Sequence, residues 1–249
     1  MRPPPLDRQS ALFLDVDGTL LEIALRPELV RVPAELPKLL DGLAQQRGGA
    51  LALVSGRRID EVDWLWRPWR GPAAGLHGAE RRRADASDVP GGSPADRAAA
   101  AALDRSRPAL RQFALHSPGV RLEDKGMALA LHYREAPDRE AAARDIAERW
   151  ARQECDSLQL IAGKMIFELR PLHHSKGVAI AAFMAEPPFR GRRPVFLGDD
   201  TTDEDGFAEV NRRAGLSIRV GESGEPTAAG YRLPSVDATL AWLGAERAA

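Results

Sequence analysis

The sequence predicts an α/β fold, in which a doubly wound parallel sheet carries a smaller inserted α+β unit. In the first and last thirds of the chain, short and continuously apolar runs alternate with helical patterns. Runs of this kind are typical of parallel strands that helices cover on both faces. From about residue 81 to residue 170, apolar and polar positions alternate instead, which indicates strands with one covered face.

The elements of the parallel sheet follow in chain order. In the first third, we expect strands within residues 11–16, 49–56 and 72–78 and helices within residues 33–46 and 58–66. In the last third, we expect helices within residues 175–186, 202–215 and 235–246 and strands within residues 194–200 and 216–221. Ligands of doubly wound sheets bind beyond the carboxyl ends of the strands, so those ends are the place to look for chemistry.

The inserted unit begins with an alanine-rich stretch, residues 83–103, to which we assign no helix or strand. An alternating strand within residues 126–134, a helix within 138–153 and a strand pair within 157–170 follow it. The predicted domains are a core made of residues 1–79 and 172–249 and an inserted domain of residues 80–171. The hinges between them are expected at residues 78–83 and 170–174.

Composition excludes several classes of protein. The 249 residues are 44% hydrophobic and 29% charged, which suits a globular chain of one large or two modest domains. A net charge of -1 argues against a nucleic-acid partner, and no apolar run is long enough to span a membrane. The single cysteine, Cys155, cannot form an internal disulfide, which suits a reducing compartment. We expect a cytoplasmic protein, with a monomer as the working assumption.

Two carboxylates stand at the end of the first predicted strand, in the stretch "ALFLDVDGTLLE". Asp15 and Asp17 are two residues apart, so an extended chain places both side chains on one side. Like charges this close are costly unless a cation lies between them. Taken alone, the stretch is explained equally well by an Asp-Gly turn that ends a strand.

Two further segments place polar groups at the ends of predicted elements. Ser55 ends the strand of "LALVSGRR" and could simply cap the next helix, but its hydroxyl could also bind a phosphate oxygen. Lys176 opens the helix of "SKGVAIAAF", where a cation opposes the helix dipole. The chain has only four lysines, so this unfavourable position suggests an anion to be neutralised.

The stretch "PVFLGDDTTDEDGF" adds a third carboxylate at a strand end. Acidic residues in a first helical turn are favourable without any function, which is enough to explain Asp203 to Asp205. Asp199 precedes the turn. Together with Asp15 and Asp17 it forms a set of oxygen ligands of the kind that Mg²⁺ prefers.

These four segments together predict a phosphoryl-transfer site. Asp15 would attack phosphorus and form an aspartyl-phosphate. Asp17 would protonate the leaving alcohol and then activate water. Mg²⁺ and Lys176 would neutralise the oxygens of the phosphoryl group.

The segments "DVDGTL", "SGR", "SKG" and "GDDTTDED" resemble the four signature motifs of the haloacid dehalogenase superfamily. The resemblance implies a haloacid dehalogenase-like core with an inserted cap domain, with Asp15 as nucleophile, Asp17 as acid and base, and a Mg²⁺ cofactor. Phosphate ligands would be Thr19, Ser55 and Lys176. Metal ligands would be Asp15, Asp17 through its backbone carbonyl, Asp199 and, in the outer shell, Asp203.

Further stretches, "GLHGAE", "LEDKGMALALHYR" and "GKMIFELRP", resemble the trehalose-6-phosphate phosphatase family. By this resemblance the substrate is the small molecule trehalose 6-phosphate. Glu123, Lys125 and Glu168 match residues of the inserted domain that bind sugar hydroxyls. Arg57 and His77 match positions near the site, although structural roles explain them equally well. The roles of Glu80, Lys164 and Asp200 stay open.

Two alternatives remain. The same chemistry could act on another glycosyl phosphate, such as sucrose 6-phosphate or a mannosylated phosphoester, because a change of substrate would alter only residues of the inserted domain. A catalytically silent sugar-phosphate sensor is the other. That hypothesis predicts the loss of Asp15, Asp17 or Lys176, and all three are present.

Overall fold

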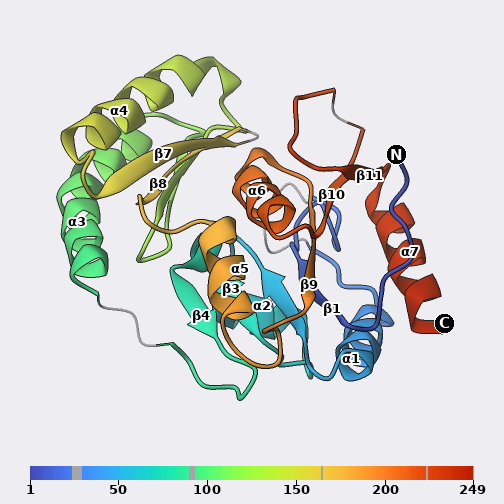
Figure 1. Ribbon diagram of the computed structural model, residues 1–249. Helices are drawn as coiled ribbons and strands as arrows, with labels where there is room; N and C mark the ends of the chain where they lie inside the picture. The colour runs from blue at the N-terminus through green and yellow to red at the C-terminus, as the bar shows by residue number, and fades with distance from the viewer. Residues whose placement is uncertain (24–29, 90–92, 164, 223, 249) are drawn as a thin grey trace. The chain divides into compact units, whose positions relative to one another are not determined.

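The computed structural model describes residues 1–23, 30–89, 93–163, 165–222 and 224–248. Its chain divides into two compact units, one formed by Met1–Val89 and Ser175–Ala249 and the other by Pro90–His174. We call them the core unit and the inserted unit (Figure 1). Lys164, whose role was left open, lies outside the described residues. No helix of the described chain is both long and apolar enough to cross a lipid bilayer.

The core unit contains a seven-stranded sheet in the order β11-β10-β9-β1-β2-β3-β4. All neighbouring strands are parallel except β3 and β4, which pair antiparallel at one edge. The strands are β1 (Ser10–Leu14), β2 (Leu51–Val54), β3 (Ala73–Gly75), β4 (Glu80–Arg82), β9 (Arg193–Gly198), β10 (Leu216–Val220) and β11 (Tyr231–Leu233). The predicted doubly wound α/β class is confirmed.

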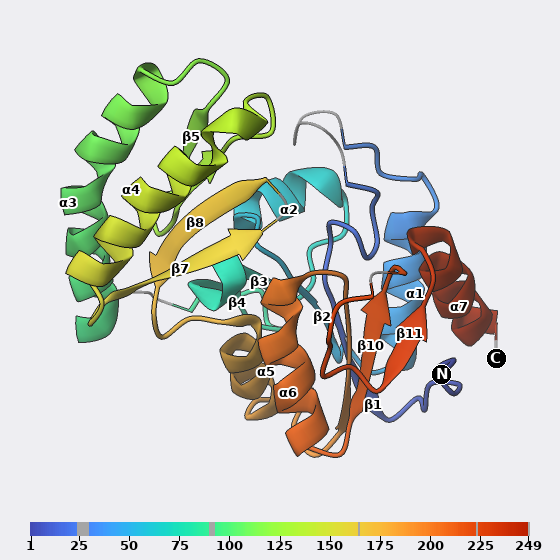
Figure 2. The ribbon, with the colours of Figure 1, turned by 90° about the horizontal axis from the view of Figure 1, so that it is seen from above.

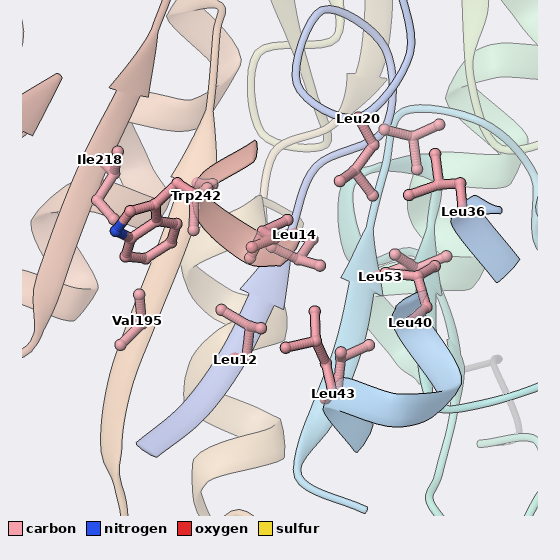
Figure 3. Close-up of a cluster of buried hydrophobic side chains, with 14 of the residues drawn as sticks. Leu12, Leu14, Leu20, Leu36, Leu40, Leu43, Leu53, Val195, Ile218 and Trp242 are labelled. Carbon is pink, nitrogen blue, oxygen red and sulfur yellow. The ribbon is translucent and has the colours of Figure 1, made fainter. Parts of the chain in front are cut away.

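Helices cover both faces of this sheet. They are α1 (Leu36–Gln46), α2 (Ile59–Leu65), α5 (Lys176–Met184), α6 (Glu204–Arg212) and α7 (Val236–Ala248). Successive residues of β1 point to opposite faces, so Leu12 and Leu14 pack with α1, α2 and α7, while Phe13 packs with α5 and α6. Figure 3 shows the first of these layers, in which Leu40 and Leu43 of α1 and Trp242 of α7 lie over the strands.

The predicted boundary at residue 80 differs from the division that the structure shows. Residues 80–89 belong to the core unit, because β4 hydrogen-bonds to β3. Arg82 of β4 is buried, and its guanidinium donates to Asp63 Oδ2 at 2.7 Å and to the carbonyl of Gly71. This edge strand is short and highly charged, so its sequence carries no apolar pattern that would indicate a strand.

The inserted unit has an antiparallel four-stranded sheet in the order β5-β6-β8-β7, with two helices on one face (Figure 2). Its elements are α3 (Pro94–Leu115), β5 (Arg121–Asp124), β6 (Leu129–His132), α4 (Glu140–Gln153), β7 (Leu158–Gly163) and β8 (Ile166–Pro171). The 22-residue α3 was not predicted, because its first half lies in the alanine-rich stretch. The helices pack on one face of the sheet, on Leu129, Leu131, Phe167 and Leu169. This agrees with the prediction that only one face of the sheet is covered.

Candidate active site

The carboxyl ends of β1 and β9 meet at the centre of the core sheet. The chain runs from β1 outward to β2 and β3, and later returns to β9 on the other side of β1. Leu14 pairs with Leu197, so Asp15 and Asp199 follow two adjacent strand ends. This reversal of strand order is the position at which open α/β sheets bind ligands.

A tight turn follows Asp15 and brings the backbone close to Asp199. Gly18 has φ +79°, and a side chain at this position would overlap with the Asp199 carboxylate. Only glycine can adopt this positive φ and approach the Asp199 carboxylate this closely without strain. The neighbouring Thr19 is fully buried, and its hydroxyl has no hydrogen-bond partner among the described residues. A buried hydroxyl of this kind is available for a bound group.

Lys176 joins the first carboxylate to a second one. It is the first residue of α5, after the cap residue Ser175, whose hydroxyl accepts the N–H of Val178. Its ammonium donates to Asp15 Oδ1 at 2.7 Å and to Asp203 Oδ1 at 2.6 Å. All three side chains are nearly inaccessible to solvent. Lys176 therefore bridges β1 to the turn after β9.

The second oxygen of Asp203 is held by the backbone. Asp203 Oδ2 accepts the N–H groups of Asp199 and Asp200, both at 2.9 Å. Gly198 makes this local turn possible, because a side chain there would overlap with the Asp203 carboxyl group. Asp200 itself caps the short helix η4 (Thr201–Asp203), accepting the N–H of Thr201 at 2.8 Å. The structure thus gives Asp200 a local structural contact.

The buried cluster carries more negative than positive charge. Oxygens of Asp15, Asp199 and Asp203 lie within 4.8 Å of one another, and Lys176 is the only cation of this group. When all four groups are ionised, three carboxylates and one ammonium leave an excess of two negative charges. Burial raises the pKa of Asp15 above its usual value, against the lowering effect of Lys176. A divalent cation bound by hard oxygen ligands would balance this charge, so these residues fit Mg²⁺.

Asp17 points to another partner. Its two carboxylate oxygens accept hydrogen bonds from Arg57 Nε at 2.7 Å and Nη2 at 2.6 Å. The pair is bidentate, a geometry that fixes the carboxylate plane as well as its position. About a third of the Asp17 side chain is exposed (35%). The structure therefore brings together two predicted site residues, Asp17 and Arg57, that the sequence did not link.

The loop after β2 and the turn after β3 form a connected pair. Ser55 is buried, and its hydroxyl accepts the N–H of Arg57 at 3.1 Å. The N–H of His77 donates to the carbonyl of Ser55 at 2.9 Å. Leu76 and His77 both have positive φ, a strained conformation for residues other than glycine. Strain of this kind persists only where the surrounding contacts hold it, as they do here.

Glu80, whose role the sequence left open, stabilises a helix end. Its Oε2 accepts the N–H of Ile59 at 2.8 Å. That N–H is one of the donors that α2 leaves without an intrahelical partner at its first turn. A structural role explains this residue.

The inserted unit places three predicted sugar-binding residues on the sheet face opposite its helices. Glu123, Ala130 and Glu168 occupy neighbouring positions across β5, β6 and β8. Lys125 Nζ donates to Glu168 Oε2 at 3.0 Å. The pKa of Glu123 is lowered, because a hydrogen bond from His132 and nearby positive charge outweigh burial, which alone would raise it.

His132 is a polar residue of this face that sequence reasoning missed. Its Nε2 lies 2.7 Å from Glu123 Oε2. The signal was available, because His132 is two residues from Ala130 and alternation places both on one face of β6. Glu123, Lys125, His132 and Glu168 are called the polar sheet face below.

Comparison with known proteins gives a consistent result. A family model described as trehalose-phosphatase matches residues 13–237. A probable trehalose-phosphate phosphatase of Sinorhizobium fredii is 46% identical over 229 residues, covering 92% of this chain and 84% of the relative. The trehalose-6-phosphate phosphatase of Escherichia coli is 45% identical over 240 residues, covering 96% and 87%.

Solved structures share the fold over nearly the whole chain. A trehalose-6-phosphate phosphatase related protein is 29% identical with a TM-score of 0.78, covering 95% of this chain and 96% of the other. The C-terminal domain of the C. albicans trehalose-6-phosphate phosphatase has a TM-score of 0.85 at 22% identity, with 98% of each chain covered. A phosphatase of the HAD superfamily from Bacteroides thetaiotaomicron has a TM-score of 0.63 at 18% identity, covering 94% and 95%. The last two likenesses concern the fold alone.

Proposed function

Because this chain belongs to the trehalose-phosphatase family, we propose that it hydrolyses trehalose 6-phosphate to trehalose and inorganic phosphate. The observation that carries the proposal is the buried cluster of Asp15, Asp199, Asp203 and Lys176 at the reversal of strand order. An excess of two negative charges in a buried group is costly for stability unless a bound cation balances it. A cluster of this kind is therefore better explained by a role in a metal-dependent reaction than by a role in folding.

Asp15 is the nucleophile in this proposal. Its carboxylate oxygen attacks phosphorus, an oxygen–phosphorus bond forms, and the bond between phosphorus and the sugar oxygen breaks. Lys176 holds Asp15 Oδ1 at 2.7 Å, which orients the carboxylate and leaves Oδ2 for the attack. Hydrolysis of the aspartyl-phosphate by water then returns Asp15 and releases phosphate.

Asp17 transfers the protons. It donates a proton to the leaving sugar oxygen and takes one from the attacking water in the second step. In the structure Arg57 occupies both oxygens of Asp17. The substrate phosphate, which is itself a bidentate partner for arginine, would draw Arg57 away and release Asp17 for this role.

The phosphate ligands proposed are Thr19, Ser55 and Lys176. The unpartnered hydroxyl of Thr19 supports its inclusion. Mg²⁺ would be held by Asp15, the backbone carbonyl of Asp17 and Asp199, with Asp203 fixing the neighbouring backbone. When bound, it would neutralise charge on the phosphoryl oxygens.

Glu123, Lys125 and Glu168 are proposed to bind the sugar hydroxyls, with Arg57 and His77 as further substrate contacts. A disaccharide presents many hydroxyls that each need a donor and an acceptor, and the polar sheet face offers both. The cytoplasmic location and the monomeric state stay predictions.

The test is phosphate release from trehalose 6-phosphate, sucrose 6-phosphate, glucose 6-phosphate and a mannosyl phosphoester, each with Mg²⁺ and with EDTA. We expect Mg²⁺-dependent release with a strong preference for trehalose 6-phosphate. Metal-dependent release from another substrate alone would keep the chemistry of Asp15 and reject the sugar contacts. Release that EDTA leaves unchanged would reject the metal site, and no release at all would favour the silent sensor.

A further inference from the structure

A second group of metal-ligand side chains lies within the inserted unit and includes none of the residues assigned to catalysis. Asp96 is in the first turn of α3, and His173 and His174 follow β8. The Nε2 atoms of both histidines lie 2.8 Å from the same oxygen, Asp96 Oδ1. The two rings are adjacent, with centroids 4.2 Å apart. We call these three residues the His-His-Asp cluster.

Hydrogen bonds on both sides fix the cluster. The other oxygen of Asp96, Oδ2, accepts the N–H of Ser93 at 2.9 Å, and the N–H of Asp96 donates to Ser93 Oγ at 3.0 Å. This capping box sets the orientation of the Asp96 carboxylate. On the other side, the Gln159 amide donates to the carbonyls of Pro171, Leu172 and His174 at 3.3 to 3.4 Å.

We propose that the His-His-Asp cluster binds a divalent transition-metal ion of the Zn²⁺ type. Two imidazole nitrogens and one carboxylate oxygen are the ligands that such ions take in proteins, with water as the fourth ligand of an open tetrahedral site. The three donor atoms already lie within 4.8 Å of one another.

The geometry requires only a small adjustment. Bond lengths of 2.0–2.2 Å in a tetrahedron place donor atoms about 3.3 Å apart. Each histidine nitrogen would therefore move about 0.5 Å away from the carboxylate oxygen. The proton of each neutral imidazole would reside on Nδ1, which frees the Nε2 lone pair. Side-chain exposures of 35% for His173 and 16% for His174 and Asp96 leave access for an ion and a water molecule.

A bound ion would connect the two ends of the inserted unit. This unit begins at Pro90 and ends at His174, and the cluster contains residues close to both limits. An ion that binds the folded unit but not the unfolded chain stabilises the fold by mass action. We therefore expect Zn²⁺ to raise the unfolding temperature through this cluster.

The competing explanation is a purely hydrogen-bonded cluster, in which both imidazoles donate to one carboxylate oxygen and no ion binds. The experiment uses the full chain saturated with Mg²⁺, which occupies the proposed catalytic metal site. Zn²⁺ is titrated by calorimetry, and the histidine ¹⁵N resonances and the unfolding temperature are followed. Variants are H173A and H174A, with H116A as the control, since His116 is an exposed histidine of the same unit that lies outside the cluster.

We expect one equivalent of Zn²⁺ that shifts the Nε2 resonances of His173 and His174. Affinity should fall by about tenfold or more in H173A and H174A, with loss of the thermal shift, and stay unchanged in H116A. If H174A does not fold, the more exposed His173 carries the test as H173Q. No Zn²⁺ uptake by the Mg²⁺-saturated chain would overturn the proposal, and so would equal affinity in the wild type and the cluster variants. Neither result depends on turnover.

Discussion

The core unit and the inserted unit bury their polar side chains to different extents. In the core unit, Asp15, Lys176 and Asp203 are 4%, 2% and 0% exposed, and they sit at strand and helix ends inside the fold. On the polar sheet face of the inserted unit, the Glu123 and His132 side chains are 23% and 25% exposed, and those of Lys125 and Glu168 are 13% and 8% exposed. The first group is held by the ion pairs of Lys176 and by backbone hydrogen bonds to Asp203, whereas the second lies along one face of a sheet.

In the proposed function, this difference separates the residues that carry out the chemistry from those that select the substrate. Displacing a buried ionic group disturbs its neighbours, because the desolvated charges lose their partners. Replacing a side chain on a sheet face changes what the face binds but leaves the opposite, helix-covered face intact. Changes to the buried cluster of the core unit should therefore affect turnover of every substrate. Changes on the polar sheet face should affect only the binding of substrates that carry the sugar.

The largest effect is expected from D15N. We predict a loss of turnover of about 10⁴-fold or more, because an amide cannot replace the nucleophile. Stability should not decrease, since the change removes one of three crowded negative charges. Phosphate release and thermal unfolding measure the two properties. Turnover near that of the wild type would reject Asp15 as nucleophile.

The next largest effect is expected from G18A. The added methyl would overlap with the Asp199 carboxylate, and the positive φ adds strain of about 1–2 kcal/mol. Displacement of the site should lower turnover about 10²-fold. G191A is the matched control, because Gly191 has φ +78° with nothing within 4 Å of the new methyl. Equal losses of turnover in both variants would show that backbone strain alone is responsible.

A smaller and selective effect is expected from K125M. Lys125 pairs with Glu168 on the polar sheet face, so its loss should raise KM for trehalose 6-phosphate about tenfold, the effect of one lost polar contact. Hydrolysis of p-nitrophenyl phosphate, which has no sugar, should be unchanged. R152M, which removes an exposed cation of the same unit, should affect neither substrate. Equal effects of K125M on both substrates would contradict a role in sugar binding.

The smallest effect concerns a structural ion pair of the core unit. Two hydrogen bonds from Arg81 lower the pKa of Glu186. A carboxyl group with a lowered pKa stabilises the fold above its unfolded pKa and loses this contribution as the pH falls through its folded pKa. E186Q should therefore reduce the free energy of unfolding by about 1 kcal/mol at pH 7 and by less below about pH 4.

Urea unfolding at both pH values measures this difference. E148Q provides the control, since Glu148 forms an exposed pair with Arg152 on α4 and should contribute about 0.5 kcal/mol or less. A deficit in E186Q that is the same at both pH values would mean that the side chain contributes by packing rather than by charge.

The strands of the core were predictable because their signal is local. Continuous apolar runs mark β1, β2, β9 and β10, and the polar residues that end them identify the carboxyl edge of the sheet. Asp15, Ser55 and Asp199 were predicted as site residues in this way, whereas Lys176 was predicted from its position at the start of a helix. The edge strand β11 was missed, as β4 was, because a strand of three residues at a sheet edge carries no recognisable pattern.

Other features were missed for different reasons. The start of α3 had a readable signal, since Ser93, Pro94 and Asp96 form a capped first turn, but alanine-rich composition concealed it. The pairs Asp17–Arg57 and Lys176–Asp203 depend on segments 40 and 27 residues apart. Such partners are set by tertiary packing, which no local pattern records.

The reversal of strand order has a consequence for the order in which the molecule is made. Asp15 and Lys176 are 161 residues apart, and β9 and the turn after it are later still. A chain leaving the ribosome presents β1 first, then the complete inserted unit, and only afterwards the strand that pairs with β1 on its other side. The inserted unit is continuous in sequence and can fold before synthesis ends. The proposed catalytic carboxylates and Lys176 come together only after β9 has been synthesised.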